Sequence, residues 1–226
     1  MGKTFFLTGT DTDAGKTVVA CGLLEAARRN NLKTLALKPI SAGCQPTVAG
    51  LRNDDALALM EAMTGELAYE QVNPVSTEPP IAPHIALEQS GRRVTIDRLA
   101  GYCRGALMHR SDFALIEGAG GWRVPVNSRE MLSDLPKALG TPVILVVGMK
   151  LGCLNHARLT VEAILHDGLK LAGWVANCVQ PEMAVYKENL ETLKQLIPAP
   201  CLGEVPYLEN PAKDTVADYL DVSALC

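Results

Sequence analysis

Short apolar runs alternate with amphipathic segments along the whole chain. Residues 4–8 are aromatic and β-branched, which predicts a buried strand, and apolar positions recur at helical spacing over residues 16–29. Similar runs predict strands at residues 33–37, 113–117, 142–148, 171–176 and 202–205, with helices at residues 54–63, 95–109, about 153–166 and up to about 196. This alternation predicts an α/β fold with an open, mostly parallel sheet and helices on both faces.

Polar and proline-rich stretches separate these elements. Residues 40–52 and 73–83 are rich in Gly, Pro and Ser and are predicted to be loops, and Pro83 is suited to the first turn of another helix. After a segment at residues 206–208 the chain is expected to end in a tail. No repeat or linker interrupts the pattern, so we expect one domain over residues 1–226.

The first predicted strand and helix are joined by Gly9–Thr17, which reads GTDTDAGKT. A glycine-rich loop that opens a helix turns backbone N–H groups toward a phosphate, and the helix start adds partial positive charge. Lys16 would then reach the β- and γ-phosphates, and the Thr17 hydroxyl would bind Mg²⁺. Five residues separate Gly9 from Gly15, where the strict pattern has four, and an ordinary turn is the alternative interpretation.

Composition and net charge limit the kinds of molecule that the protein is expected to bind. Of the 226 residues 48% are hydrophobic, and the net charge is −4, so neither nucleic acid nor an anionic membrane is expected to bind. The longest apolar run, residues 142–148, is too short for a membrane span, and no signal peptide is recognisable. Seven cysteines without a CxxC pair predict reduced, mostly buried thiols. We expect a cytoplasmic protein whose partners are small molecules or other proteins.

Polar residues stand where three predicted strands end. Lys38, Glu117 and Asn177 follow strands whose carboxyl ends share one rim of a parallel sheet. Lys38 is either a phosphate ligand or a solvated lysine, and Asn177 either contacts adenine or forms a turn. Glu117 occupies the usual position of a magnesium carboxylate. The glycines of Gly118–Gly121 either donate N–H groups to an anion or form a tight turn.

Three further features have both structural and functional interpretations. Asn53 is a good helix cap, and acidic Asp54 and Asp55 suit a first helical turn, although Asp55 is also a candidate metal ligand. His84 is more easily explained as structural. The helix start at residues 152–155 is either a plain cap or a carboxylate site. No NKxD motif is present, which favours adenine over guanine.

Taken together, the motifs resemble the dethiobiotin synthetase family over nearly the whole chain. They are GTDTDAGKT, LKPIS, RNDDALAL, NPVSTEPPIAPHIA, LIEGAGGW, PVILVVGMKLGCLNHARLT, LAGWVAN and GEVPYLEN. That family shares the lengthened phosphate loop. The resemblance implies a P-loop NTPase-like three-layer sandwich and an ATP- and Mg²⁺-dependent cyclo-ligase. Its substrates would be 7,8-diaminononanoate and CO₂, its product dethiobiotin, and its intermediates a carbamate and a carbamic-phosphoric anhydride.

The resemblance also implies roles for individual residues. The catalytic residues would be Lys16, Lys38 and Thr12, and the metal ligands Thr17, Asp55 and Glu117. Nucleotide would contact Asp13, Ala14, Gly15, Lys16, Thr17, Val18, Asn177, Pro206, Tyr207 and Leu208. Substrate would contact Ser41, Gly118, Ala119, Gly120 and Gly121, and its carboxylate would meet Gly152, Cys153, Leu154 and Asn155 of the neighbouring subunit in a homodimer.

Two positions depart from the family pattern. Ala42 stands where members commonly have Ser or Thr before the glycine, and the substrate-side tyrosine of some members cannot be aligned securely with Tyr186. Three other classes are weighed against the synthetase. Chromosome- and septum-positioning ATPases carry a signature lysine where this chain has Asp11, amidotransferase-type synthetases add a glutaminase domain, and nitrogenase iron proteins need cysteines that this chain lacks.

Overall fold

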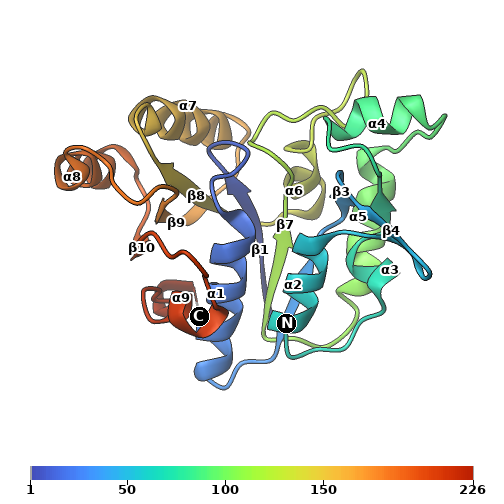
Figure 1. Cartoon of the computed structure of the whole chain (residues 1–226), viewed down its shortest axis with the longest axis horizontal. Helices are drawn as coiled ribbons and strands as arrows, with labels where there is room; N and C mark the ends of the chain where they lie inside the picture. Colours follow the sequence, from blue (N-terminus) through green and yellow to red (C-terminus); the bar gives the residue numbers. More distant parts are fainter. Residues whose placement is uncertain (1, 226) are drawn as a thin grey trace.

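The computed structural model describes residues 2–225 and has a six-stranded parallel sheet at its centre (Figure 1). The strands are arranged in the order β10-β9-β8-β1-β7-β2. Their bounds are β1 (Lys3–Gly9), β2 (Thr34–Leu37), β7 (Phe113–Glu117), β8 (Val143–Met149), β9 (Leu171–Cys178) and β10 (Cys201–Val205). All six lie within two residues of the predicted strands.

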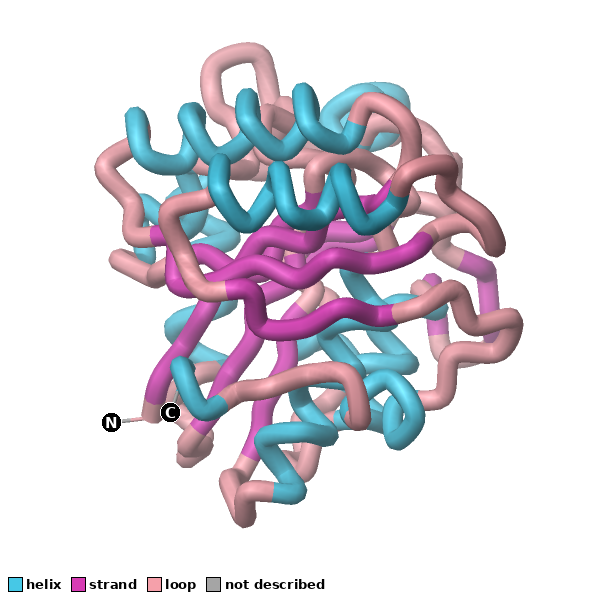
Figure 2. The backbone as a smooth tube through the Cα atoms, turned by 90° about the vertical axis from the view of Figure 1, so that its left-hand side faces the viewer, coloured by secondary structure: helices cyan, strands magenta, loops and turns pink. Residues whose placement is uncertain are grey.

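Helices cover both faces of the sheet, as Figure 2 shows. The longer ones are α1 (Lys16–Arg29), α2 (Asp54–Ala62), α5 (Ile96–Ala106), α7 (Cys153–His166) and α8 (Tyr186–Leu196). The shorter ones are α3 (Tyr69–Val72), α4 (Pro83–Gln89), α6 (Asp134–Leu139), α9 (Lys213–Ala217) and the 3₁₀ turn η1 (Ser223–Leu225). The predicted α/β class with a covered parallel sheet is therefore confirmed.

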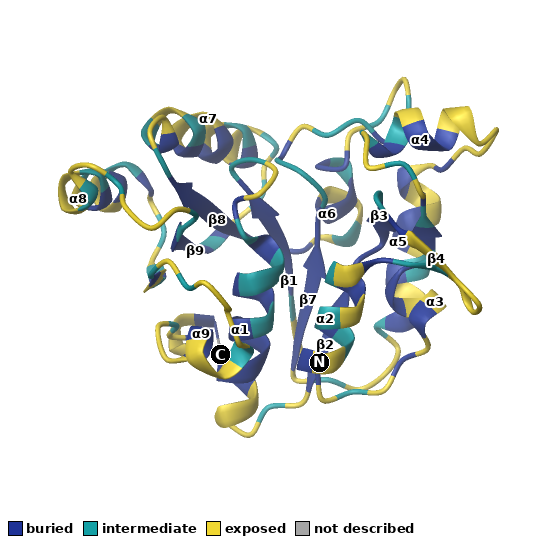
Figure 3. Ribbon diagram, viewed as in Figure 1, coloured by how far each residue is buried: buried dark blue, intermediate teal, exposed yellow. Residues whose placement is uncertain are grey.

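The first strand lies in the interior of the sheet. β1 pairs with β7 through five residue pairs, from Lys3 opposite Phe113 to Leu7 opposite Glu117, and with β8 on its other side. The strands are dark blue in Figure 3 because their side chains are buried on both faces, which is why they appear in the sequence as continuous apolar runs. The loop after β1 thus starts from the buried interior of the sheet.

Residues 40–52, predicted to be a loop, contain three short strands. β3 (Ile40–Ser41) pairs in parallel with β6 (Val75–Ser76), and β4 (Gln45–Thr47) forms an antiparallel hairpin with β5 (Gly50–Arg52). Gly50 adopts a φ of 99°, and the Thr47 hydroxyl donates to its carbonyl at 2.7 Å, so local turn chemistry closes the hairpin. The prediction was wrong because these strands, of two or three residues each, are too short to show an apolar period, and β4 and β5 are also largely exposed.

The segment after residue 208, predicted to be a tail, contains a helix. α9 packs against α1, where Gly22 gives it room: a Cβ on Gly22 would lie 2.4 Å from Val216 Cγ1. Arg29 at the end of α1 also donates to Asp218 at 2.6 Å. A helix of five residues shows too little periodicity to be recognised in the sequence, and α3 and α6 were missed for the same reason.

Two expectations concern the chain as a whole. Among the described residues, no helix combines the length and apolarity that crossing a bilayer needs. Six cysteines lie in the described part of the chain and all are free thiols, of which Cys44, Cys103 and Cys153 are buried and the others half-buried. Cys226 lies outside the described residues.

Candidate active site

The phosphate-type loop lies between the end of β1 and the start of α1. Asp13 and Gly15 both adopt left-handed backbone angles, with φ of 59° and 81°. Gly15 also allows a close approach, because a Cβ there would lie 2.1 Å from the side-chain nitrogen of Asn177. Lys16 is buried, and its ammonium group donates to the Asp11 carbonyl at 3.2 Å across the loop. The loop is thus closed around the Lys16 side chain.

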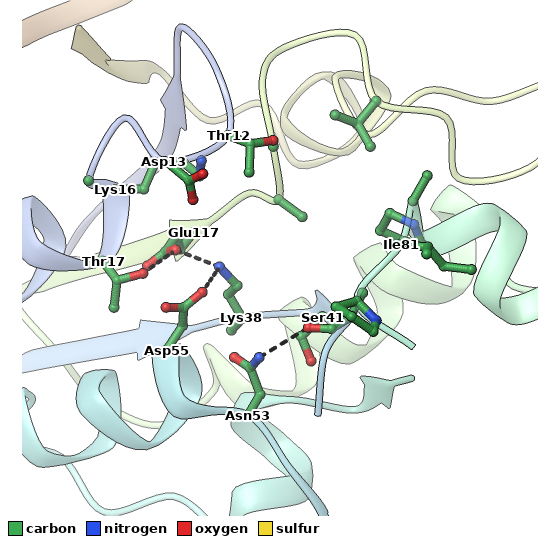
Figure 4. A pocket seen from close by; sticks show the side chains of 18 of the residues that line it. Thr12, Asp13, Lys16, Thr17, Lys38, Ser41, Asn53, Asp55, Ile81 and Glu117 are labelled. Atoms are coloured by element: carbon green, nitrogen blue, oxygen red, sulfur yellow. Dashed lines mark hydrogen bonds and ion pairs between the residues drawn. The ribbon is translucent and has the colours of Figure 1, made fainter. Parts of the chain in front are cut away.

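Lys38 lies beside this loop at the end of β2, between two carboxylates (Figure 4). Its Nζ donates to Glu117 Oε1 at 2.5 Å and to Asp55 Oδ2 at 2.9 Å. The Thr17 hydroxyl donates to the same Glu117 oxygen at 2.8 Å. Four predicted site residues from four elements therefore form one hydrogen-bonded cluster, and Lys38 is not the solvated lysine of the alternative interpretation.

The charged groups in this cluster shift one another's pKa values. Burial works to lower the pKa of Lys38, but Glu117 and Asp55 outweigh it and hold this pKa above its ordinary value. The pKa of Lys16 is lowered, first by burial and then by the positive charge of Lys38. Burial works to raise the pKa of Asp55, and Lys38 holds it below its ordinary value. At neutral pH Lys38 is therefore a fixed ammonium group and Asp55 is ionised.

The same cluster offers a cation its preferred ligands. Glu117 Oε2 is buried and has no hydrogen-bond partner among the described residues, and its other oxygen is shared by Thr17 and Lys38. A buried carboxylate oxygen without a partner is costly unless a cation or water binds it. Thr17, Asp55 and Glu117 present only oxygen donors, which fits Mg²⁺.

A cavity of about 700 Å³ opens in front of this cluster. Its walls come from the glycine loop, from the segments after β2 and β7, and from the connection before α4. The lining residues are Thr12, Asp13, Gly15, Lys16, Thr17, Val18, Lys38, Ser41, Ala42, Asn53, Asp55, Pro80, Ile81, Ala82, Pro83, Glu117, Ala119, Gly120, Arg123, Val124 and Pro125. Most of the predicted catalytic, metal and substrate residues thus face one cavity.

A smaller cavity of about 180 Å³ continues from the other side of the loop. Asp13, Gly15 and Val18 line both cavities, and the remaining wall contains Asn177, Cys178, Val179, Val205, Pro206, Tyr207, Leu208 and Pro211. The Asn177 side chain donates to the Ala14 carbonyl at 2.9 Å, so one of its amide hydrogens already fixes the loop. The predicted adenine-side residues therefore lie together, next to the phosphate loop.

Some predicted substrate contacts are directed elsewhere. The Ser41 hydroxyl is buried and donates to Asn73 Oδ1 at 2.8 Å, so an internal network uses it. The Gly118 N–H donates to the Leu7 carbonyl at 2.9 Å, as a continuation of the sheet, and is not free for an anion. Ala119 and Gly120 line the cavity, whereas Gly118 and Gly121 do not.

The helix start at Gly152–Asn155 lies outside this cavity. Gly152 has a φ of 93° and forms the N-cap of α7, and Cys153 is buried beneath it. None of Gly152, Cys153, Leu154 and Asn155 lines the cavity of its own chain. Leu151 beside them is 96% exposed. A contribution of this helix to substrate binding would have to come from a second copy.

The structure adds contacts that the sequence did not suggest. Asp11 accepts a hydrogen bond from Lys150 at 2.9 Å, which joins the phosphate loop to the end of β8. Ile81 and Arg123 line the cavity from segments that have no secondary structure. Only the proline-rich composition of residues 79–83 and the run GGW hinted that these loops take fixed shapes. Tyr186 lies outside the lining residues of both cavities.

Comparison with known proteins agrees with this geometry. A family model described as an AAA domain matches residues 3–214. The ATP-dependent dethiobiotin synthetase BioD of Cellvibrio japonicus is 58% identical over 99% of this chain and 97% of its own length. The protein of the same name from Pseudomonas paraeruginosa is 56% identical over 98% and 97%. This chain belongs to the dethiobiotin synthetase family. As a member of that family it is an ATP-dependent ligase.

Solved structures with low identity show how widely this synthetase's fold is shared. A ParA family ATPase from Chlorobium tepidum aligns with a TM-score of 0.57 at 11% identity, over 96% of this chain and 98% of that one. The septum site-determining protein MinD from Pyrococcus horikoshii aligns with a TM-score of 0.55 at 16% identity, over 96% and 87%. These likenesses confirm the P-loop NTPase fold. They do not make this synthetase a positioning ATPase.

Proposed function

We propose that this synthetase joins 7,8-diaminononanoate and CO₂ into the cyclic urea dethiobiotin, and converts ATP to ADP and phosphate. The names of the relatives support the product, and the phosphate loop supports the nucleotide. The observation that carries the proposal is Lys38, held as a buried ammonium group beside Lys16 and the phosphate loop, in a cavity large enough for a second substrate.

The proposed reaction needs two anions to approach each other. One amino group of the diamine adds to CO₂ and loses a proton, which gives a carbamate. A carbamate oxygen then attacks the γ-phosphorus of ATP and ADP leaves, which forms a carbamic-phosphoric anhydride. The second amine attacks the carbonyl carbon, phosphate leaves, and loss of a proton completes the ring. Lys16 and Lys38 would neutralise the carbamate and the γ-phosphate as they meet.

Thr12, Asp13 and the metal ligands would complete the phosphate end. Thr12 lines the cavity on the side of the loop, where its hydroxyl could contact a phosphate oxygen or the carbamate. Thr17, Asp55 and Glu117 would hold Mg²⁺, whose charge offsets that of the β- and γ-phosphates. The adenine would occupy the smaller cavity between Asn177 and the segment Pro206–Leu208.

We also propose that the active site is completed by a second copy of the chain. The helix start at residues 152–155 would bind the substrate carboxylate of the neighbouring subunit, because the helix dipole and the N–H groups of a first helical turn favour an anion. Leu151, almost fully exposed in one chain, would be covered in the dimer. The free thiols support action in a reducing compartment such as the cytoplasm.

The deciding experiment is an assay by mass spectrometry with purified protein, 7,8-diaminononanoate, bicarbonate, ATP and Mg²⁺. We expect dethiobiotin and ADP in equal amounts, both dependent on the diamine. The Lys16→Ala variant serves as the control for a contaminating enzyme and should form neither product. ADP formation that does not depend on the diamine, without dethiobiotin, would contradict the proposal.

Subunit mixing tests the proposed dimer. Lys16→Ala damages the phosphate side of a site, and Asn155→Leu damages the proposed carboxylate side. In a mixed dimer one site carries both changes and the other carries neither, so an equal mixture of two inactive variants should regain about a quarter of wild-type activity. Failure to regain activity, although mixed dimers form, would place Asn155 in the site of its own chain, and a fully active Asn155→Leu variant would exclude it from the site.

A further inference from the structure

Trp122 and Arg123 directly follow the glycine segment of the active site, and both are bound by one carboxylate. The indole N–H of Trp122 donates to Asp167 Oδ2 at 2.9 Å. The guanidinium of Arg123 reaches both oxygens, at 2.7 Å to Oδ2 and 2.9 Å to Oδ1. Asp167 is the residue after the last turn of α7, and its side chain is only 7% exposed.

These contacts have the geometry of a strong, directional attachment. One oxygen of the carboxylate accepts a hydrogen bond from the guanidinium and the other forms a close ion pair with it, so distance and orientation are both fixed, and the low exposure of the carboxylate strengthens the attachment. Arg123 also donates to the Ser133 hydroxyl at 3.0 Å. Burial works to raise the pKa of Asp167, but the hydrogen bonds from Arg123 and Trp122 hold it below its ordinary value. Lys137 Nζ, 3.8 Å from Asp167 Oδ1, is a second cation near this carboxylate.

The attached segment has no helix or strand of its own to hold it. Residues 118–125 run from the end of β7 along the cavity, and Ala119, Gly120, Arg123 and Val124 line it. Besides Asp167, the Trp122 ring is supported by an edge-on contact with Phe6 of β1, with ring centres 6.1 Å apart. Because the Arg123 charge is already paired, its influence on the cavity comes from its position.

We propose that Asp167 is a positioning residue that fixes the 118–125 segment in the shape required to bind the second substrate. It does not touch the cavity, and it acts through Trp122 and Arg123. None of these three residues lines the cavity next to Asn177, so the effect should fall on the substrate and not on the nucleotide. The identity of that substrate rests on the proposed function.

The test compares Asp167→Asn with a matched control on the same helix. Asp167→Asn keeps the size of the side chain and removes the charge that binds Arg123. Glu162→Gln removes an exposed ion pair with Arg158 in α7, whose two side chains are 52% and 53% exposed. We expect the KM for 7,8-diaminononanoate to rise about tenfold in Asp167→Asn, with the KM for ATP within about twofold of wild type. Glu162→Gln should change neither.

Arg123→Lys provides a second variant in case Asp167→Asn folds poorly. It keeps the positive charge and loses the planar pair of donors, so we expect the same rise in KM for the diamine. An unchanged KM for the diamine in either folded variant would overturn the proposal. Equal rises in both KM values would also overturn it, because they would indicate a general structural role.

A spectroscopic measurement separates this proposal from the proposed function. The chain has two tryptophans, so a uniformly ¹⁵N-labelled protein gives two indole N–H signals beside its backbone amide signals, and Trp122→Phe identifies one of them. Asp167→Asn should shift that signal and also the backbone amides of Ala119 and Gly120, while Glu162→Gln leaves them in place. If the wild-type protein forms no dethiobiotin, the proposed function fails, and unchanged Ala119 and Gly120 signals would independently refute the positioning role.

Discussion

Lys38 shows how one side chain can serve both stability and chemistry. Its ammonium group is buried between Glu117, which is fully buried, and Asp55, which is 45% exposed. Such a pair is expensive to break because removing one partner leaves the other buried without compensation. The lysine proposed to bind the carbamate is therefore also the residue that compensates the buried charge of Glu117.

The first prediction follows from this arrangement. Lys38→Met should abolish activity and lower the free energy of unfolding by about 3 kcal/mol, because Glu117 is left buried and unpaired. Adding Glu117→Gln should restore most of the stability and none of the activity. Urea unfolding followed by circular dichroism measures the free energy of unfolding. A double variant as unstable as the single one would show that the loss comes from packing and not from charge.

A second prediction concerns the hydroxyl of Thr17. Thr17→Val keeps the shape of the side chain and removes the group that bonds to Glu117, so we expect turnover to fall about 100-fold. Thr17→Ser keeps the hydroxyl and should stay within about tenfold of wild type. Rates measured over a range of Mg²⁺ concentrations distinguish them, because the Val variant should need more Mg²⁺. Equal losses in both variants would argue against a metal-binding hydroxyl.

At the residue scale the sequence predicts which charged and hydroxyl side chains lie together. Lys16, Thr17, Lys38 and Glu117 follow strands whose carboxyl ends must meet, so their proximity follows from the predicted fold. The side-chain direction of Ser41 could not be predicted in this way, because a buried amide on Asn73 competes for its hydroxyl. Resemblance to a family identifies positions, while the hydrogen bonds available in the folded chain decide what each position can still bind.

At the scale of elements, the contact between α1 and α9 depends on Gly22. A third prediction compares two helical glycines. Gly22→Ala should destabilise the protein by about 1–3 kcal/mol, because the new methyl group would overlap Val216 and Leu220. Gly101→Ala in α5 meets nothing within 4 Å and should stabilise the protein by up to about 1 kcal/mol. Thermal unfolding of the two variants measures these changes in stability. An equal change in both would show that helix propensity, and not a steric clash, governs both sites.

The strands of the central sheet and the longer helices were predicted well, and the short elements outside the sheet were not. α1 has the predicted bounds, and the apolar run of β8 agrees to within one residue. The β4–β5 hairpin, α6 and α9 were missed because each is too short to show an apolar period and takes its shape from the elements it packs against. The cavity wall formed by residues 80–83 was missed for a similar reason, since the shape of a loop depends on what it packs against.

At the scale of the molecule, ionised acids stabilise the fold at neutral pH. Glu25 in α1 is buried and accepts hydrogen bonds from Arg28 and Arg29. Arg29 also donates a hydrogen bond to Asp218, the residue after α9. The hydrogen bonds from Arg28, and then those from Arg29, lower the pKa of Glu25 to about 2 against the effect of burial. Its ordinary value is 4.5.

A fourth prediction follows from the sign of this shift. Because the pKa is lower in the folded state, the contribution of Glu25 is fully present above about pH 5 and is lost as the pH falls toward 2. The free energy of unfolding should therefore fall between pH 6 and pH 3 in the wild type, and it should fall by about 1–2 kcal/mol less in Glu25→Gln. This range is reduced for solvent screening, because the two arginines are half-exposed. Urea unfolding at several pH values measures this, and parallel curves would contradict it.

The place of β1 in the sheet has a consequence for biosynthesis. Among the described residues, β1 pairs only with β7 and β8, which are synthesised more than 100 residues later. The nascent chain therefore carries an apolar, unpaired strand until those residues emerge, and such segments bind chaperones or aggregate. Fragments that end before residue 149 should not assemble the sheet. Changes that slow completion of the chain should therefore lower the yield of folded protein, while the activity of each folded molecule stays close to that of the wild type.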